Sequence, residues 1–125
     1  MELGLDIYFL KKKKEGDEEL GYFRKVNFLV QFFEDRGYKI ENCVPITITK
    51  EDVYSLKECC EQVLGDHSLA NAYLPTCAGF FFGSTDYDEY YFSDVDRVLD
   101  FCNETLIPEI EDLKEDEEIE FEIWY

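Results

Sequence analysis

The chain has 125 residues, of which 12 are basic and 30 are acidic, and its formal net charge at pH 7 is −18. A hydrophobic content of 46%, with 17% aromatic residues, excludes a disordered chain and predicts a single acidic domain over residues 1–125. The negative charge disfavours direct binding to nucleic acid or to an anionic membrane, because both need lysine and arginine. It favours a cationic partner instead.

The first part of the chain predicts a strand, a loop and a long apolar helix. Leu3 to Leu10 has the alternation of a strand, and Lys11 to Glu19 is a charged connection. Leu20 to Arg36 is predicted to form a helix that Gly37 ends. The apolar residues of this helix repeat at helical spacing: Phe23, Val26, Val30 and Phe33.

The middle of the chain predicts a strand and three further helices. Cys43 to Thr49 is rich in valine, isoleucine and threonine, as strands are. Thr49 has the character of an N-cap, and the helix that follows it is expected to end at Gly65. Ser68 to Tyr73 predicts a short helix, and a capping pattern at Ser93 predicts the start of another.

The last segment completes the fold prediction. Ile119 to Tyr125 alternates between apolar and polar residues, which is typical of a half-buried strand. Since strands occur at both ends with helices between them, we predict an α+β fold. We expect a small sheet that includes the paired N- and C-terminal strands, packed against about three helices.

Residues with obvious catalytic or metal-binding chemistry are scarce. His67 is the only histidine, and the five cysteines include no C-x-x-C pair. Zinc sites with two histidines and a Ser-His-Asp arrangement are therefore disfavoured. We predict no catalytic residue, no metal and no cofactor, so a binding protein is favoured over an enzyme. The cysteines are expected to be reduced thiols in a cytoplasmic setting.

The last third of the chain carries most of the net charge. Residues 86–125 contain 16 acidic and 2 basic residues. Asp96, Asp100 and Glu104 recur every four residues on a predicted helix, roughly 6 Å apart along its axis. This spacing resembles regular backbone phosphates, and tyrosine and tryptophan are typical interface anchors. The predicted partner-binding residues are Asp86, Asp88, Glu89, Tyr90, Tyr91, Asp94, Asp96, Asp100, Glu104 and Trp124.

These residues lead to one functional hypothesis and leave two others open, of which the plainest is an acidic interaction module that imitates no nucleic acid. The first is that the chain binds a basic protein, a nucleic-acid-binding enzyme, by imitating the charge of a nucleic acid. The second is a pocket in which Arg24, Lys25 and Asn27 hold an anionic group while Asp88 and Glu89 act on it or bind a metal. Arg24 and Lys25 can instead pair with carboxylates of the same chain. We interpret the run Lys11 to Lys14 as a solvated hairpin or as an internal partner for acidic groups.

Four segments resemble a family of small proteins encoded by bacteriophages and prophages. They are GLDIY (Gly4 to Tyr8), GYFRKVN (Gly21 to Asn27), LPT (Leu74 to Thr76) and GFFFGSTDYDEYY (Gly79 to Tyr91). The family has Gly-Leu-Asp-Met-Tyr, Tyr-Trp-Arg-Lys-Ala-Asn, Leu-Pro-Thr and Gly-Phe-Phe-Phe-Gly motifs, followed by Tyr-Asp-Glu. The chain departs from these motifs at three positions: Ile7, Phe23 and Val26.

The resemblance implies phage origin and the cytoplasm of a bacterial host. Together with the charge, it suggests an anti-defence protein that inhibits a host nuclease such as a CRISPR effector. The shared polar positions also strengthen the alternative, a pocket for a nucleotide-like ligand. That predicted ligand set is Tyr8, Tyr22, Arg24, Lys25, Asn27, Tyr87, Asp88 and Glu89.

Overall fold

The computed structural model describes residues 4–125, and within them four strands form one antiparallel sheet in the order β2-β1-β4-β3. The chain-terminal strands are its central pair, since Asp6 lies opposite Trp124 and Lys12 opposite Glu118. The predicted α+β class and the pairing of the two end strands are confirmed. The strands are β1 (Asp6–Lys12), β2 (Glu18–Arg24), β3 (Ile46–Thr47) and β4 (Glu118–Trp124).

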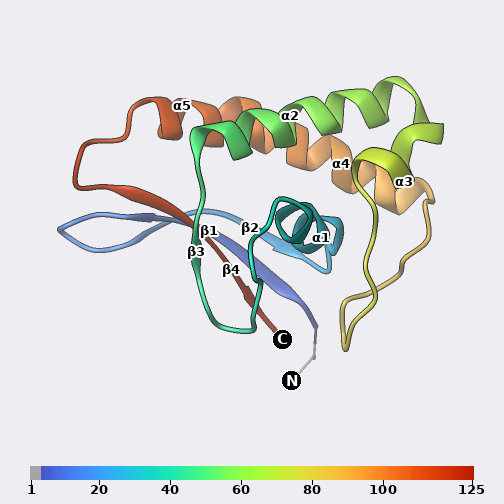
Figure 1. Cartoon of the computed structure of the whole chain (residues 1–125), viewed down its shortest axis with the longest axis horizontal. Helices are drawn as coiled ribbons and strands as arrows, with labels where there is room; N and C mark the ends of the chain where they lie inside the picture. Colours follow the sequence, from blue (N-terminus) through green and yellow to red (C-terminus); the bar gives the residue numbers. More distant parts are fainter. Residues whose placement is uncertain (1–3) are drawn as a thin grey trace.

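The helices lie on one side of the sheet (Figure 1). Helices α2 and α4 run beside each other as an outer layer, and α1 packs between that layer and the sheet. The rings of Phe33 in α1 and Phe121 in β4 are 4.4 Å apart, and the ring of Phe28 contacts that of Tyr91 in α4. The helices are α1 (Phe28–Asp35), α2 (Lys50–Gly65), α3 (Ala70–Tyr73), α4 (Glu89–Phe101) and α5 (Ile107–Glu111).

Alternation along β4 separates the core from the opposite face of the sheet. Ile119, Phe121 and Ile123 are buried beneath the helices, as the sequence predicted. Glu122 and Trp124 point the other way, toward Tyr8 of β1. In the described part of the chain no helix covers that opposite face, which we call the outer sheet face (Figure 1).

The predicted helix over Leu20 to Arg36 is wrong in its first half. Residues 18–24 form β2 in a hairpin with β1, and the helix begins only at Phe28. The backbone reverses at Lys25, whose φ of 59° is left-handed. A Cβ on Gly21 would lie 2.5 Å from the ring of Phe101, so the close packing of α4 on β2 requires glycine there. Pairing with β1 outweighs the helical periodicity.

Two other predicted boundaries are corrected. The strand expected over Cys43 to Thr49 shrinks to β3, because Pro45 has no N–H to donate and Cys43 has a left-handed φ of 63°. Helix α4 begins at Glu89 rather than at Ser93, since the carboxylate of Asp88 accepts hydrogen bonds from the N–H groups of the first turn.

Helix α2 begins where the sequence predicted. Thr49 and Asp52 form a reciprocal capping box: each side chain accepts a hydrogen bond from the other residue's N–H. Val53, Leu56 and Cys60, which recur at helical spacing along α2, are buried. The short helix expected at residues 68–73 is present as a 3-10 turn, η1 (His67–Leu69), followed by α3.

Candidate functional site

Three carboxylates of the predicted acidic surface form a row on the outside of the helical layer. Asp96 and Asp100 lie on α4, and Glu104 lies on η2 (Cys102–Leu106), the π turn that follows it. All three are exposed, and none forms an ion pair or a side-chain hydrogen bond within residues 4–125. Burial of Val95, Val98 and Cys102 on the opposite side of this helix holds the row outward. We call these three residues the carboxylate row.

Helix α2 adds acidic residues that sequence reasoning did not include. Glu58 and Glu61 are exposed on α2, beside α4 in the outer layer, and neither has an ion-pair partner in the described chain. Their helical positions could have indicated this, since they alternate with the buried core stripe of α2. The helical layer therefore presents unpaired negative charge from two helices.

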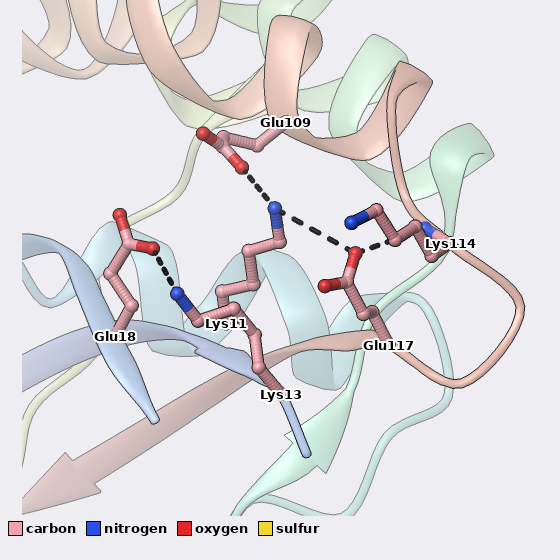
Figure 2. Close-up of polar contacts among 6 residues, drawn as sticks. All are labelled: Lys11, Lys13, Glu18, Glu109, Lys114 and Glu117. Carbon is pink, nitrogen blue, oxygen red and sulfur yellow. Dashed lines mark hydrogen bonds and ion pairs between the residues drawn. The ribbon is translucent and has the colours of Figure 1, made fainter. Parts of the chain in front are cut away.

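The lysines of the β1–β2 hairpin form ion pairs with carboxylates outside the carboxylate row (Figure 2). The Nζ atom of Lys11 lies 2.8 Å from Glu109 of α5 and 3.8 Å from Glu117, while Lys13 pairs with Glu18 at 3.0 Å. The hydrogen bond to Glu109 raises the pKa of Lys11. We call this group of paired charges the hairpin cluster. The interpretation of the lysine run as an internal partner for carboxylates is confirmed for Lys11, Lys12 and Lys13.

The one arginine of α4 contacts Asp94 and Phe23 and forms no ion pair with the carboxylate row. Arg97 pairs with Asp94 at 2.9 Å, and its guanidinium lies 5.4 Å from the ring centre of Phe23. Burial raises the pKa of Asp94, and the contact with Arg97 only partly opposes it. Asp94 is therefore paired and half-buried, unlike the carboxylate row.

Two predicted aromatic anchors do not belong to this surface. Tyr91 is buried, and its hydroxyl donates to the carbonyl oxygen of Leu74 at 2.7 Å, so it is a core residue and not a partner contact. Trp124 lies on the outer sheet face, on the other side of the sheet from α4. Tyr90 is 73% exposed at the start of α4 and remains available.

A pocket of about 240 Å³ lies where β2, the start of α1 and the start of α4 meet. Arg24, Lys25, Asn27 and Asp88 line it, so four residues of the alternative ligand set are together. Five members of the predicted partner surface line it too: Asp86, Asp88, Tyr90, Tyr91 and Asp94. Its walls carry both positive and negative side chains.

The side chain of Asn27 is engaged in hydrogen bonds to the backbone of the pocket wall and is not free to contact a ligand. Its Nδ2 donates to the carbonyl oxygens of Phe82 and Ser84 at 3.1 and 3.0 Å, and its Oδ1 accepts from the N–H of Cys77 at 3.1 Å. The side chain is 3% exposed. Asn27 therefore ties the 77–84 loop to the start of α1, which is a structural role.

The rest of the alternative set is dispersed, which corrects the expectation of one shared pocket. Tyr8 and Tyr22 lie on the outer sheet face with rings 5.3 Å apart. The hydroxyl of Tyr87 donates to Asn71 at 2.8 Å, and Glu89 is exposed in the first turn of α4.

Groups able to hold a metal ion through three histidine, cysteine or carboxylate side chains are absent from residues 4–125. All five cysteines are free thiols, and burial raises the pKa of Cys60 and Cys102. No helix in the described part of the chain has the length and apolar character needed to cross a membrane. Comparison with models of known protein families, with curated proteins and with solved structures found no match.

Proposed function

We propose that the chain is a binding protein that occupies a basic, nucleic-acid-binding surface of another protein through its carboxylate row. The observation that carries this proposal is that Asp96, Asp100 and Glu104 are exposed and unpaired while the lysines of the hairpin cluster are bound to other carboxylates. Negative charge repeated along α4 and the π turn η2 complements the lysine and arginine side chains of such a surface.

We further propose that the partner is a host enzyme that this chain inhibits. The resemblance to phage proteins favours a host defence enzyme, such as a CRISPR effector or another nuclease, as the protein that is inhibited. Glu58 and Glu61 widen the negative surface across α2, and Tyr90 supplies an aromatic contact beside it.

Affinity purification from a bacterial lysate at two salt concentrations tests this proposal. Captured proteins should be retained at about 50 mM salt, released at about 500 mM, and displaced at low salt by added duplex DNA. The double variant Asp96→Lys plus Asp100→Lys should lose capture. The matched control, Glu34→Lys plus Glu41→Lys, makes the same change in net charge at exposed positions away from α4 and should retain it.

Capture that resists both salt and DNA, or that survives the charge reversal on α4, contradicts the proposal. Loss of capture in both double variants means that total charge, and not the carboxylate row, determines binding, which contradicts it equally.

A second candidate function is favoured by the pocket between β2 and α4. Its mixed lining, with Arg24 and Lys25 as well as Asp86, Asp88 and Asp94, suits a small ligand that carries both acidic and basic groups. Thermal-shift measurements with nucleotides and amino acids, with and without Mg²⁺, test this function. A shift that Lys25→Ala abolishes and Lys39→Ala preserves supports it; the absence of any shift rejects it.

A further inference from the structure

The outer sheet face carries a row of aromatic rings that the proposed function does not use. The ring of Tyr8 lies 5.3 Å from that of Tyr22 on one side and 6.5 Å from that of Trp124 on the other. Tyr22 and Trp124 are 42% and 52% exposed. Three adjacent rings on an uncovered sheet face form an apolar strip that water contacts directly.

Carboxylates surround this aromatic strip. In the sheet register Glu122 lies beside Tyr8, and Glu19 and Glu120 flank Leu10. Within residues 4–125 none of these three glutamates forms an ion pair, because Arg24 pairs with Asp6 and Lys12 pairs with Asp17. Burial raises the pKa of Glu120; the charge of Lys12 opposes this rise, and neighbouring carboxylates add to it.

A shallow pocket lies at the centre of this arrangement. Its volume is about 250 Å³, and its walls are two aromatic rings, one aliphatic side chain and two carboxylates: Tyr8, Trp124, Leu10, Glu19 and Glu122. Glu122 also accepts a hydrogen bond from the indole Nε1 of Trp124, which fixes the ring beside the carboxylate. The space suits the head group of one side chain rather than a nucleotide.

We propose that this pocket binds an arginine side chain of a partner protein. The rings of Tyr8 and Trp124 stand at 74° to each other, so the planar guanidinium would stack on one ring and meet the other at its edge, while Glu19 and Glu122 supply the opposite charge. The negative surroundings repel phosphate groups, so a nucleic acid does not fit. A second copy of this chain does not fit either, because its outer sheet face would bring the same glutamates together.

This inference does not depend on the carboxylate row, which lies on the helical layer on the other side of the sheet. The two surfaces can be tested separately. Trp124 is the single tryptophan of the chain, so its fluorescence reports on the arginine pocket alone. The helical layer has no such reporter.

The test is a fluorescence titration of the full chain with three blocked peptides of the sequence Gly-X-Gly-X-Gly, where X is arginine, citrulline or lysine. The arginine peptide should change Trp124 emission in a saturable manner. Citrulline has nearly the same shape without the charge and should bind about tenfold more weakly or less. Lysine lacks the planar fork and should also bind more weakly.

Glu19→Gln plus Glu122→Gln should weaken binding of the arginine peptide by about tenfold, while Asp100→Asn should leave it unchanged. Equal binding of all three peptides, no saturable change, or full binding by the glutamine variant overturns the proposal. If the glutamine variant does not fold, the comparison of peptides on the unmodified chain decides alone. Asp96→Lys plus Asp100→Lys should leave this titration unchanged, which separates it from the proposed function.

Discussion

The hairpin cluster and the carboxylate row contain the same kind of acidic residue in opposite circumstances. In the hairpin cluster, Lys11 and Lys13 hold Glu109, Glu117 and Glu18 at 2.8 to 3.8 Å. On α4 the carboxylate row has no cation in contact within the described residues. The net charge of −18 is therefore not spread as one uniform surface: carboxylates in the hairpin cluster are neutralised by lysines, and those of the carboxylate row are not.

The difference has a physical consequence for each region. Paired surface charges join β1 to α5 and contribute modestly to the stability of the fold. Unpaired carboxylates along one helix repel each other, so the row contributes nothing to folding that would explain its presence. Binding to a cationic partner, as we propose, would relieve this repulsion.

The largest effect is expected where a carboxylate is both paired and buried. Asp52 is 3% exposed and accepts hydrogen bonds from Arg36, Tyr38 and the N–H of Thr49. Asp52→Asn should lower the free energy of unfolding by about 2 to 4 kcal/mol, because the charge of Arg36 loses its partner. Urea denaturation measures this. A loss no greater than that of Asp100→Asn would remove the distinction between paired and unpaired carboxylates.

The pH dependence of the same residue sharpens the comparison. Burial raises the pKa of Asp52, but the hydrogen bonds from Tyr38, Thr49 and Arg36 outweigh it, and the pKa in the folded chain is lowered. The stabilisation is therefore fully present above the unfolded pKa of about 4, and it is lost as pH falls through the lower folded value. The difference in unfolding free energy between the unmodified chain and Asp52→Asn should shrink over that range. If this difference in unfolding free energy stays constant from neutral to acid pH, the pKa of Asp52 is not lowered by folding.

A smaller effect is expected in the hairpin cluster. Lys11→Met should lower the free energy of unfolding by about 1 kcal/mol, because Lys11 is mostly buried between Glu109 and Glu117. Lys13→Met, at a more exposed pair, should be indistinguishable from the unmodified chain. A double-mutant cycle with Glu109→Gln isolates the interaction of Lys11 with Glu109. A coupling energy of zero would mean that this ion pair does not stabilise the fold.

The smallest effect on folding is expected on the carboxylate row. Asp96→Asn plus Asp100→Asn should change the free energy of unfolding by no more than about 0.5 kcal/mol, with a slight gain from relieved repulsion. Thermal and urea unfolding measure this change. A clear loss of stability would show that these carboxylates support the fold and would assign them to the same class as the hairpin cluster.

The sequence predicts most where one segment determines its own structure. The alternation of Ile119, Phe121 and Ile123 and the capping residues of α2 are local signals, and both predictions were confirmed. Strand β2 was missed because it depends on pairing with β1 and on contact between Gly21 and Phe101, far apart in the chain. Phe23 and the apolar residues after it recur at helical spacing, so the sequence predicted a helix where β2 forms.

The residues of the candidate site also fall into those that local spacing predicted and those whose roles depend on distant contacts. The spacing of Asp96 and Asp100 placed them on one helical face, and the structure has them exposed there. The burial of Tyr91 depends on the carbonyl of Leu74, and the role of Asn27 depends on a loop that begins at Cys77. No local pattern indicates either contact, so both residues were predicted to bind and are structural instead.

Whether the carboxylate row itself binds the partner is decided by comparing two variants of equal net charge in one binding measurement. A protein captured from the lysate is titrated with Asp96→Lys plus Asp100→Lys and with Glu34→Lys plus Glu41→Lys at about 50 mM salt. The first variant should lose at least about tenfold in affinity, while the second should stay close to the unmodified chain. Equal affinities of the two variants would contradict the proposal.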